Sequence, residues 1–445
     1  MQVIKFGGTS IGNPEQIRIA LSIIDFNKDN IVVLSAFSGV TATLCEFIRQ
    51  ANNSDFDTCK LLIKKIEDKH ISFTNELLQS SSITKIALNQ ISKSIHLLEK
   101  FISRRINSIN EKEILAQGEL LSAKIIYLYL LEREIDVALL PALNFMRLNS
   151  KKDPDLTLIK KRLSSELKKY TECRLFLTNG FICKNHRNKV DNLGRGGSDY
   201  TATIIGNVIN ASVVEIWTDI DGLHNNDPRF VDNTQAIRNI SYNEACELAY
   251  FGAKILHPSS ITPAQSANIP LIIKNTLNPN DKGTVISEYT IPKAIKAISA
   301  KDDISTIKVK SGRMMQAYGF LRKVFEIFEK YETPVDMLTT SEISVAMTID
   351  NNEYLDKIKT ELQTLGEVEI ETNQSIICVV GDFSKNNNKL IQLILDALVD
   401  IPVQMISFGA SNINISLVVD AKNKVETLNI LNHILQNELC LTEIQ

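Results

Sequence analysis

The feature that most constrains the fold is a regular alternation of short apolar segments with amphipathic helical patterns over the first two-thirds of the chain. The apolar segments have the length and composition of buried strands, and they occur at 3–6, 31–34, 137–140, 174–177, 213–217 and 271–274. The first helix is expected to begin with Asn13 as its N-cap and Pro14 at its first position. This order predicts a mostly parallel sheet covered by helices on both faces, a three-layer α/β/α sandwich.

Two regions depart from this alternation. Residues 58–109 are helical in pattern and rich in Lys, Glu and Ile, and we interpret them as a helical insertion that flanks the active-site cleft, with a structural role. After about Pro292 two similar units follow, because residues 334–338 and 344–350 are echoed by residues 402–406 and 414–420. Each unit has the order βαββαβ, which is a ferredoxin-like pattern. The pair suggests a regulatory region, and a packing or dimerisation domain is the alternative.

Composition argues against several classes of protein. The net charge of −3 is unlike the basic field of nucleic-acid-binding proteins. A membrane span needs about 20 apolar residues, and no apolar run in this sequence approaches that length. Too few residues precede Gly7 for a signal peptide. The seven cysteines form no CxxC pair, and the six histidines form no metal-ligand cluster. We therefore expect a cytoplasmic protein with reduced thiols, no membrane or nucleic-acid partner and no metal site of its own.

Two glycine-rich motifs indicate phosphate chemistry, although neither is a P-loop or a protein-kinase motif. Lys5 ends a predicted strand and is followed by Gly7 and Gly8, whose backbone N–H groups can approach an anion; a simple turn is the alternative. Arg195 stands among three glycines before a predicted helix whose N-terminus can bind an anion, with Ser198 or Asp199 as the expected cap.

Three further segments carry charged residues. Asp219 and the residues up to Arg229 follow a strand and could bind a nucleotide, although tight turns explain them equally well. Glu119 follows Gly118 near the start of an apolar helix and could hold an ammonium group; an exposed first-turn glutamate is the alternative. Glu244 completes a capping box with Ser241, so we interpret it as structural.

Taken together, four segments resemble the aspartate kinases of the amino-acid kinase superfamily in order and spacing. These segments are 5–10, 194–202, 217–219 and 251–258. The resemblance is closest to the monofunctional, lysine-sensitive type, whose tail contains paired ACT domains. It implies a catalytic domain over 1–292, a first ACT domain over 304–372, and a second formed by 293–303 and 373–445. It also implies transfer of phosphate from ATP, with Mg²⁺ bound to the ATP phosphates, to the side-chain carboxylate of aspartate, the first step of lysine, threonine and methionine biosynthesis.

The resemblance also implies a role for individual residues. Catalysis is assigned to Lys5, Gly7, Gly8 and Asp199. Aspartate binding is assigned to Ser35, Thr41, Glu119, Phe181, Arg195 and Ser198, with Glu119 on the ammonium and Arg195 on the α-carboxylate. Nucleotide binding is assigned to Thr218, Asp219, His224, Arg229 and Lys254, where His224 replaces a tyrosine that is frequent in the family. Lysine binding is assigned to Met314, Gly319, Phe320, Leu321, Asp336, Thr340, Ser341 and Glu342.

The resemblance further implies allosteric inhibition by lysine and a homodimer, or a dimer of dimers, formed through the ACT domains. Two alternatives stay open. The chain could phosphorylate another small acid such as glutamate, because Arg195 and Glu119 recognise an α-amino acid without measuring the length of its side chain. It could also be a non-catalytic amino-acid sensor, and the presence of Lys5, Asp199 and Lys254 argues against that.

Overall fold

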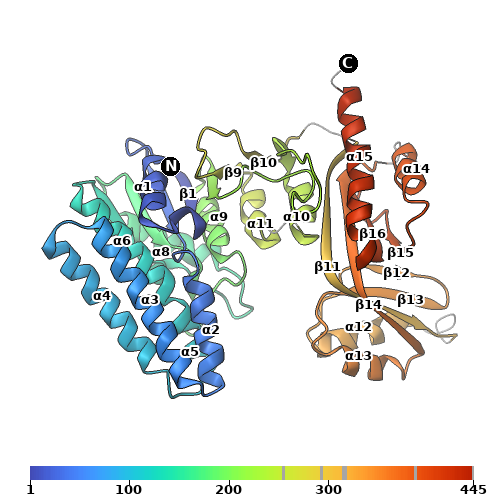
Figure 1. Cartoon of the computed structure of the whole chain (residues 1–445), viewed down its shortest axis with the longest axis horizontal. Coiled ribbons are helices and arrows are strands. Elements are labelled where there is room, and N and C mark those ends of the chain that lie inside the picture. The colour runs from blue at the N-terminus through green and yellow to red at the C-terminus, as the bar shows by residue number, and fades with distance from the viewer. Residues whose placement is uncertain (253–255, 291–293, 313–317, 385–387, 443–445) are drawn as a thin grey trace. The chain divides into compact units, whose positions relative to one another are not determined.

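The computed structural model describes residues 1–252, 256–290, 294–312, 318–384 and 388–442 of the chain (Figure 1). The chain divides into two compact units. The first unit consists of Met1–Leu223, Arg238–Tyr242 and Leu256–Tyr289. The second unit consists of His224–Ile237, Asn243–Ile255 and Thr290–Gln445. The domain boundaries drawn from the sequence stay predictions.

The first unit is built around an eight-stranded sheet with the order β3-β4-β2-β1-β7-β9-β10-β8. Its strands are β1 Gln2–Phe6, β2 Asn30–Leu34, β3 Val137–Leu140, β4 Leu175–Asn179, β7 Val214–Thr218, β8 Asn239–Ser241, β9 Leu271–Asn275 and β10 Thr284–Ser287. Every pairing is parallel except that of β9 with β10. Strand β2 is buried along its whole length, as expected for a strand with both faces covered. The predicted α/β/α sandwich is confirmed.

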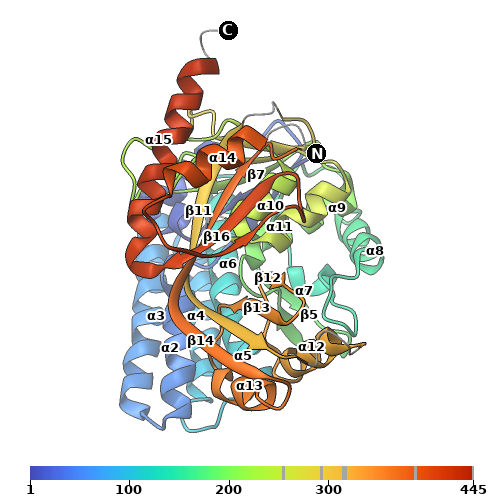
Figure 2. The same ribbon diagram turned by 90° about the vertical axis from the view of Figure 1, so that its right-hand side faces the viewer.

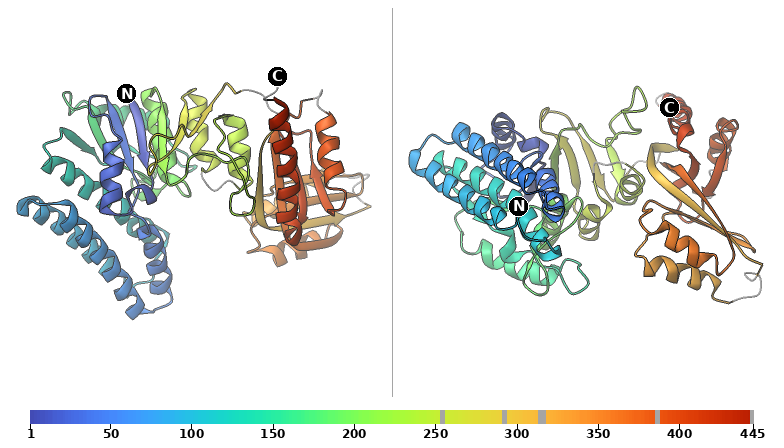
Figure 3. Two further views of the ribbon diagram at one scale, coloured as in Figure 1. Left: turned by 45° about the horizontal axis from the view of Figure 1, so that its top comes forward. Right: turned by 60° about the horizontal axis from the view of Figure 1, so that its bottom comes forward.

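Helices of the first unit begin and end close to their sequence signals. They are α1 Pro14–Ser22, α2 Val40–Asn52, α3 Phe56–Leu77, α4 Ser81–Glu99, α5 Ser108–Leu115, α6 Gln117–Glu132, α7 Ala142–Phe145, α8 Leu156–Leu167, α9 Gly197–Ile209 and α11 Pro258–Ser266. Asn13 caps α1 as predicted, since its side chain accepts a hydrogen bond from the N–H of Gln16 at 2.8 Å. The helical insertion is confirmed as α3 and α4, two long neighbouring helices in Figure 3 whose buried residues join the core beneath β1 and β2.

One stretch of the first unit, Ser108–Glu132, is long and apolar enough to cross a membrane by composition alone, contrary to our expectation that no run approaches that length. Within its most apolar window 78% is buried inside the protein. Helix α6, which makes up most of this stretch, packs against β2, β3 and β4, so its apolar surface is used in the core of the first unit.

The second unit contains an antiparallel six-stranded sheet with the order β12-β13-β11-β14-β16-β15. Its strands are β11 Ile295–Lys310, β12 Leu338–Thr340, β13 Ser344–Ile349, β14 Glu367–Gly381, β15 Val403–Ser407 and β16 Asn414–Asp420, and its helices are α10 Tyr242–Tyr250, α12 Phe320–Lys330, α13 Leu355–Leu362, α14 Asn388–Ala397 and α15 Lys424–Thr442. In Figure 2 the long strands β11 and β14 run through both ends of this sheet, with α12 and α13 at one end and α14 and α15 at the other.

The two ends have separate apolar cores, one with α12 and α13 and one with α14 and α15. The first part of β11 pairs with the last part of β14, from Ile295 opposite Gly381 to Lys301 opposite Ile376. The stretch near 294–303 therefore joins the sheet of the last repeat, as the resemblance predicts. Glu244, interpreted as structural, forms a buried ion pair with Lys296 at 2.7 Å, which ties α10 to β11.

Candidate active site

A pocket of about 900 Å³ lies at the carboxyl ends of β1, β2, β4 and β7. This edge is where open α/β sheets bind their ligands, because the loops that follow the strands converge there. Twelve of the predicted site residues line this one pocket: Lys5, Gly7, Gly8, Ser35, Thr41, Glu119, Phe181, Arg195, Ser198, Asp199, Thr218 and Asp219. The fold therefore brings together residues that are up to 214 positions apart in the sequence.

Lys5 and Asp199 form an ion pair at the centre of this pocket. The Lys5 Nζ atom lies 2.5 Å from Asp199 Oδ1, and the two side chains are only 9% and 11% exposed. Lys5 is the last residue but one of β1, which pairs with β2 on one side and β7 on the other, so its backbone is fixed by the sheet. Asp199 lies in the first turn of α9, where the helix dipole favours a negative charge.

The start of α9 differs from the sequence prediction. Its N-cap is Gly196, and neither Ser198 nor Asp199 caps the helix, since both lie within its first turn. Gly196 has a φ of 66°, and a Cβ there would lie 2.8 Å from the Cβ of His257. Backbone conformation and close packing thus require glycine at this position. As a result Ser198 and Asp199 both face the pocket.

Glu119 is buried, and the alternative of an exposed first-turn glutamate is wrong. Its side chain enters the pocket from α6, and Oε1 accepts a hydrogen bond from the N–H of Ala36 at 3.3 Å. Among the described residues, Oε2 has no hydrogen-bond donor although it is buried. Burial raises the pKa of Glu119 to about 8, and the Ala36 N–H only partly offsets this. Gly118 allows this approach, because a Cβ there would lie 2.8 Å from the Cβ of Ala36.

Arg195 and Phe181 complete this end of the pocket. Arg195 is exposed, and in the part of the chain that the structure describes no carboxylate forms an ion pair with it. Its guanidinium is therefore available to an anionic ligand. Phe181 has a φ of 64°, which is unusual for an aromatic residue, and its N–H donates a hydrogen bond to Thr201 Oγ1 at 2.9 Å. Gly197 permits this arrangement, because a Cβ there would lie 2.6 Å from the Phe181 ring.

In the loop that follows β2, sequence reasoning found Ser35 and missed Phe37 and Ser38. These two residues also line the pocket, and residues of α3 support them. Lys69 Nζ donates a hydrogen bond to the carbonyl of Ser38 at 2.7 Å, and the ring of His70 lies 5.4 Å from that of Phe37. Burial lowers the pKa of His70 to about 4, so this ring is neutral near pH 7. No motif marked these contacts, because they join a loop to a helix about 30 residues away.

The other predicted nucleotide residues belong elsewhere in the chain. His224 and Arg229 are in the second unit, and Lys254 lies outside the described residues. The Nδ1 atom of His224 is 2.9 Å from Thr234 Oγ1. Arg229 forms a two-point ion pair with Asp227, with its Nε 2.9 Å from Oδ1 and its Nη2 2.5 Å from Oδ2. Their roles toward a nucleotide stay predictions.

The predicted effector residues lie in the second unit, except that Met314 is outside the described residues. Gly319 is the N-cap of α12 and Phe320 is buried in its first turn, while Leu321, Thr340, Ser341 and Glu342 are exposed. The side chain of Asp336 is 1% exposed, and its Oδ1 accepts hydrogen bonds from Lys301 at 2.8 Å and Tyr250 at 2.7 Å. Its Oδ2 is buried without a donor among the described residues.

Comparisons with known proteins show which family the chain resembles. The chain matches the model of the amino acid kinase family over residues 1–275 and that of an ACT domain over residues 377–435. It is 32% identical to the chloroplastic aspartokinase 3 of Arabidopsis thaliana, over 94% of this chain and 78% of the relative. It is 28% identical to the lysine-sensitive aspartokinase 3 of Escherichia coli K12, over 96% of this chain and 98% of the relative.

Solved structures of an aspartokinase match the fold of this chain. The fold matches that of E. coli aspartokinase III in complex with aspartate and ADP with a TM-score of 0.87, at 28% identity, over 97% of this chain and 99% of that one. The complex of the same enzyme with lysine and aspartate matches with a TM-score of 0.78 over the same shares of both chains.

We predict that Glu119 holds a proton at neutral pH in the ligand-free protein, because burial disfavours its charged form. Infrared difference spectra of wild type minus Glu119→Gln, recorded from pH 5 to pH 10, should show one buried carboxyl group that ionises near pH 8. Glu113→Gln, which changes a glutamate of the preceding helix α5 outside the pocket lining, serves as the matched control. Ionisation of Glu119 near its ordinary value, about 4.3, would contradict the prediction.

Proposed function

The chain belongs to the amino acid kinase family and is an aspartokinase, and on this premise we propose how its residues transfer the γ-phosphoryl group of ATP to the side-chain carboxylate of aspartate. The product of this reaction is 4-phospho-L-aspartate. The observation that carries the proposal is the convergence, in one pocket, of the Lys5–Asp199 ion pair with the buried Glu119 and the available Arg195. The pocket thus holds separate groups for a phosphoryl group and for both charged ends of an α-amino acid.

Glu119 and Arg195 recognise the backbone groups of the substrate in this proposal. The Oε2 atom of Glu119, which has no donor among the described residues, accepts a hydrogen bond from the ammonium group of aspartate. Burial disfavours the ionised form of Glu119, and the positive charge of the bound ammonium stabilises it. The fork of Arg195 pairs with the α-carboxylate through two hydrogen bonds. Ser35, Thr41, Phe181 and Ser198 also line the pocket, and we assign them to the rest of the aspartate molecule, including its side-chain carboxylate.

Lys5 acts on the group in transfer. Its ammonium neutralises charge that spreads over the phosphoryl oxygens in the transition state, and the backbone N–H groups near Gly7 and Gly8 add to this. Asp199 acts on Lys5, since its carboxylate holds the ammonium in place at 2.5 Å. The attacking carboxylate needs no general base at neutral pH, because it is already ionised. The protein therefore contributes position and charge rather than covalent chemistry.

ATP with Mg²⁺ is the phosphoryl donor that we propose. Thr218 and Asp219 lie at the end of β7 in the pocket, and we assign them to the nucleotide, with His224, Arg229 and Lys254 as further predicted contacts. No cluster of three or more metal-ligating side chains occurs among the described residues, which fits an ion bound chiefly through phosphates and waters. Of the carboxylates that line the pocket, we assign those of Asp199 and Asp219 to hold the ion alongside the phosphates. We place this soluble enzyme in the cytoplasm.

Lysine is the allosteric inhibitor that we propose for the second unit. The support is the similarity to a relative named lysine-sensitive and to a structure that contains lysine. We place the inhibitor between the ACT domains of two chains, which requires at least a homodimer. We assign the carboxylate of lysine to the N-terminus of α12 at Gly319, and an ammonium to Oδ2 of Asp336, which has no donor among the described residues. Lysine inhibits only if it binds an inactive state more tightly than the active one.

The first test concerns Lys5. We predict that Lys5→Ala lowers kcat by about 100- to 1,000-fold, the usual size of the loss of one preorganised electrostatic partner. The aspartate KM should change much less, because Lys5 acts on the transferring group. Lys274→Ala is the matched control, because Lys274 stands near the end of β9, on the far side of β7 from β1, and is not in the pocket lining. A folded Lys5→Ala variant with nearly normal kcat would remove Lys5 from the mechanism.

The second test separates the two substrates. Arg195→Lys should raise the aspartate KM by about tenfold or more, because an ammonium cannot form the two-point contact of a guanidinium with a carboxylate. The ATP KM should not change. Steady-state kinetics with each substrate varied in turn measures both values. If instead the ATP KM rises and the aspartate KM is unaffected, Arg195 belongs to the nucleotide site.

The third test concerns regulation. Asp336→Asn keeps the shape of the side chain but removes its charge, so it should raise the lysine concentration for half-inhibition by about tenfold or more and leave the uninhibited kcat nearly unchanged. Asp350→Asn is the matched control, because Asp350 is the second carboxylate paired with Lys301, at 2.9 Å. Equal relief in both variants would mean that disturbance of Lys301 is the cause. Inhibition by threonine and not by lysine would exclude the lysine assignment.

A further inference from the structure

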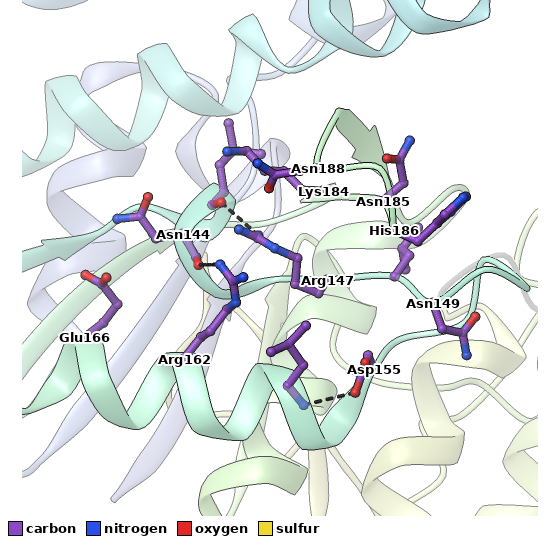
Figure 4. Close-up of a pocket in the computed structure, with 13 residues that line it drawn as sticks. Asn144, Arg147, Asn149, Asp155, Arg162, Glu166, Lys184, Asn185, His186 and Asn188 are labelled. Carbon is purple, nitrogen blue, oxygen red and sulfur yellow. Dashed lines mark hydrogen bonds between the residues drawn. The ribbon is translucent and has the colours of Figure 1, made fainter.

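A second pocket, of about 690 Å³, lies in the first unit at the closed end of a small hairpin (Figure 4). The hairpin is formed by β5 Ile182–Lys184 and β6 Val190–Asn192, and the other walls are α7, α8 and the segment between them. Its volume is that of small-molecule sites, about 300–1,000 Å³. None of the residues assigned to aspartate, nucleotide or lysine lines it.

Three permanent cations line this pocket. They are Arg147 after α7, Arg162 on α8 and Lys184 at the end of β5. Lys184 is held beside Arg147, because the two residues form a parallel bridge between their backbones. Among the described residues, none of these three cations forms an ion pair with a carboxylate.

The two carboxylates that also line the pocket have other partners. Asp155 accepts a hydrogen bond from the N–H of Leu158 at 3.0 Å and thereby caps α8. Glu166 accepts one from Lys169 at 2.8 Å. His186 stands on the hairpin turn, and its Nε2 atom is 3.3 Å from the Nε atom of Arg187. Neither carboxylate forms an ion pair with Arg147 or Arg162 in the described structure, and Arg162 donates only to the carbonyl of Asn144, at 3.4 Å.

Arg147 is the key residue of this pocket, because it is charged and only 6% exposed. Both of its hydrogen bonds use Nη1, which donates to the carbonyls of Leu143 at 2.9 Å and Met146 at 2.8 Å. Its Nε and Nη2 have no acceptor within the described part of the chain. Burial and the neighbouring Arg162 lower the pKa of Arg147. Figure 4 shows the guanidinium groups of Arg147 and Arg162 directed into the same part of the pocket.

An anion would offset this uncompensated charge. Two guanidinium groups and an ammonium offer more donors than one carboxylate can accept, whereas a phosphate dianion has three strong acceptor oxygens. We propose that this pocket is a binding site for a small phosphorylated metabolite, held by Arg147, Arg162 and Lys184. This site goes beyond the kinase chemistry proposed above and involves none of its residues.

The hairpin connects the new site to the active site. Its closed end carries Lys184, while its open end carries Phe181 just before β5 and Asn192 at the end of β6, and both of these line the active-site pocket. Phe181 holds an unusual backbone conformation with a φ of 64°, so a shift of β5 is transmitted to it with little freedom for local adjustment. Occupancy of the new site should therefore change the aspartate KM.

Equilibrium dialysis of the full chain with radiolabelled inorganic phosphate tests the site. A nonhydrolysable ATP analogue and aspartate, both saturating, block the active site. We expect one phosphate bound per chain, with affinity reduced by about tenfold or more in Arg162→Gln and in Lys184→Gln. Lys161→Gln is the matched control, because it removes the same charge from the adjacent exposed position of α8 outside the pocket. Its phosphate affinity should stay within about twofold of wild type.

Three results would overturn the proposal. One is the absence of saturable phosphate binding, and another is equal binding by wild type and Arg162→Gln. The third is tighter binding of tricarballylate, a probe with three carboxylates and no phosphate.

The link through the hairpin has its own readout, since phosphate should change the aspartate KM of wild type and not that of Arg162→Gln. An unchanged KM in wild type would exclude that link, and normal kinase activity of Arg162→Gln shows that such a failure does not concern the kinase assignment.

Discussion

The ion pair between Lys5 and Asp199 is the interaction on which the rest of the site depends. Two nearly buried charges 2.5 Å apart join the central strand of the sheet to the first turn of α9. In such a low-dielectric place each charge needs the other, because removal of one partner leaves the second desolvated and unpaired. The pair therefore fixes where an ammonium stands before any substrate arrives, and a preorganised charge is what phosphoryl transfer requires.

Around this pair, the pocket contains ionisable groups that lack a partner of their own. Glu119 has a buried oxygen without a donor in the described structure, and Arg195 has a guanidinium without a carboxylate. The buried Glu119 oxygen is costly for a folded protein until a donor reaches it, whereas the exposed guanidinium of Arg195 is simply available to an anion. Together the two groups favour a ligand that has both an ammonium and a carboxylate. The same reasoning applies to Arg147 in the second pocket and to Asp336 in the second unit, where Lys301 already satisfies one of the two oxygens.

The sequence was informative where local rules decide the structure. Strands covered on both faces are mostly apolar, so β1, β2 and β7 could be predicted, and Asn13 caps α1 as its residue type suggests. It was not informative where distant segments meet. The cap of α9 is Gly196 and not a polar side chain, because His257 leaves no room there. Burial of Glu119 depends on Ala36, which lies 83 residues earlier, and no local pattern reports such a contact.

The most direct measurement is ADP release with three acids offered at equal concentration: aspartate, glutamate and succinate. Succinate has the carbon chain and both carboxylates of aspartate but lacks the ammonium that Glu119 is proposed to bind. Turnover with aspartate that exceeds turnover with either other acid by about 100-fold or more is the expected result, because a buried carboxylate left without its ammonium is costly. Equal ADP release with all three acids, or release that needs no acid at all, would contradict the account.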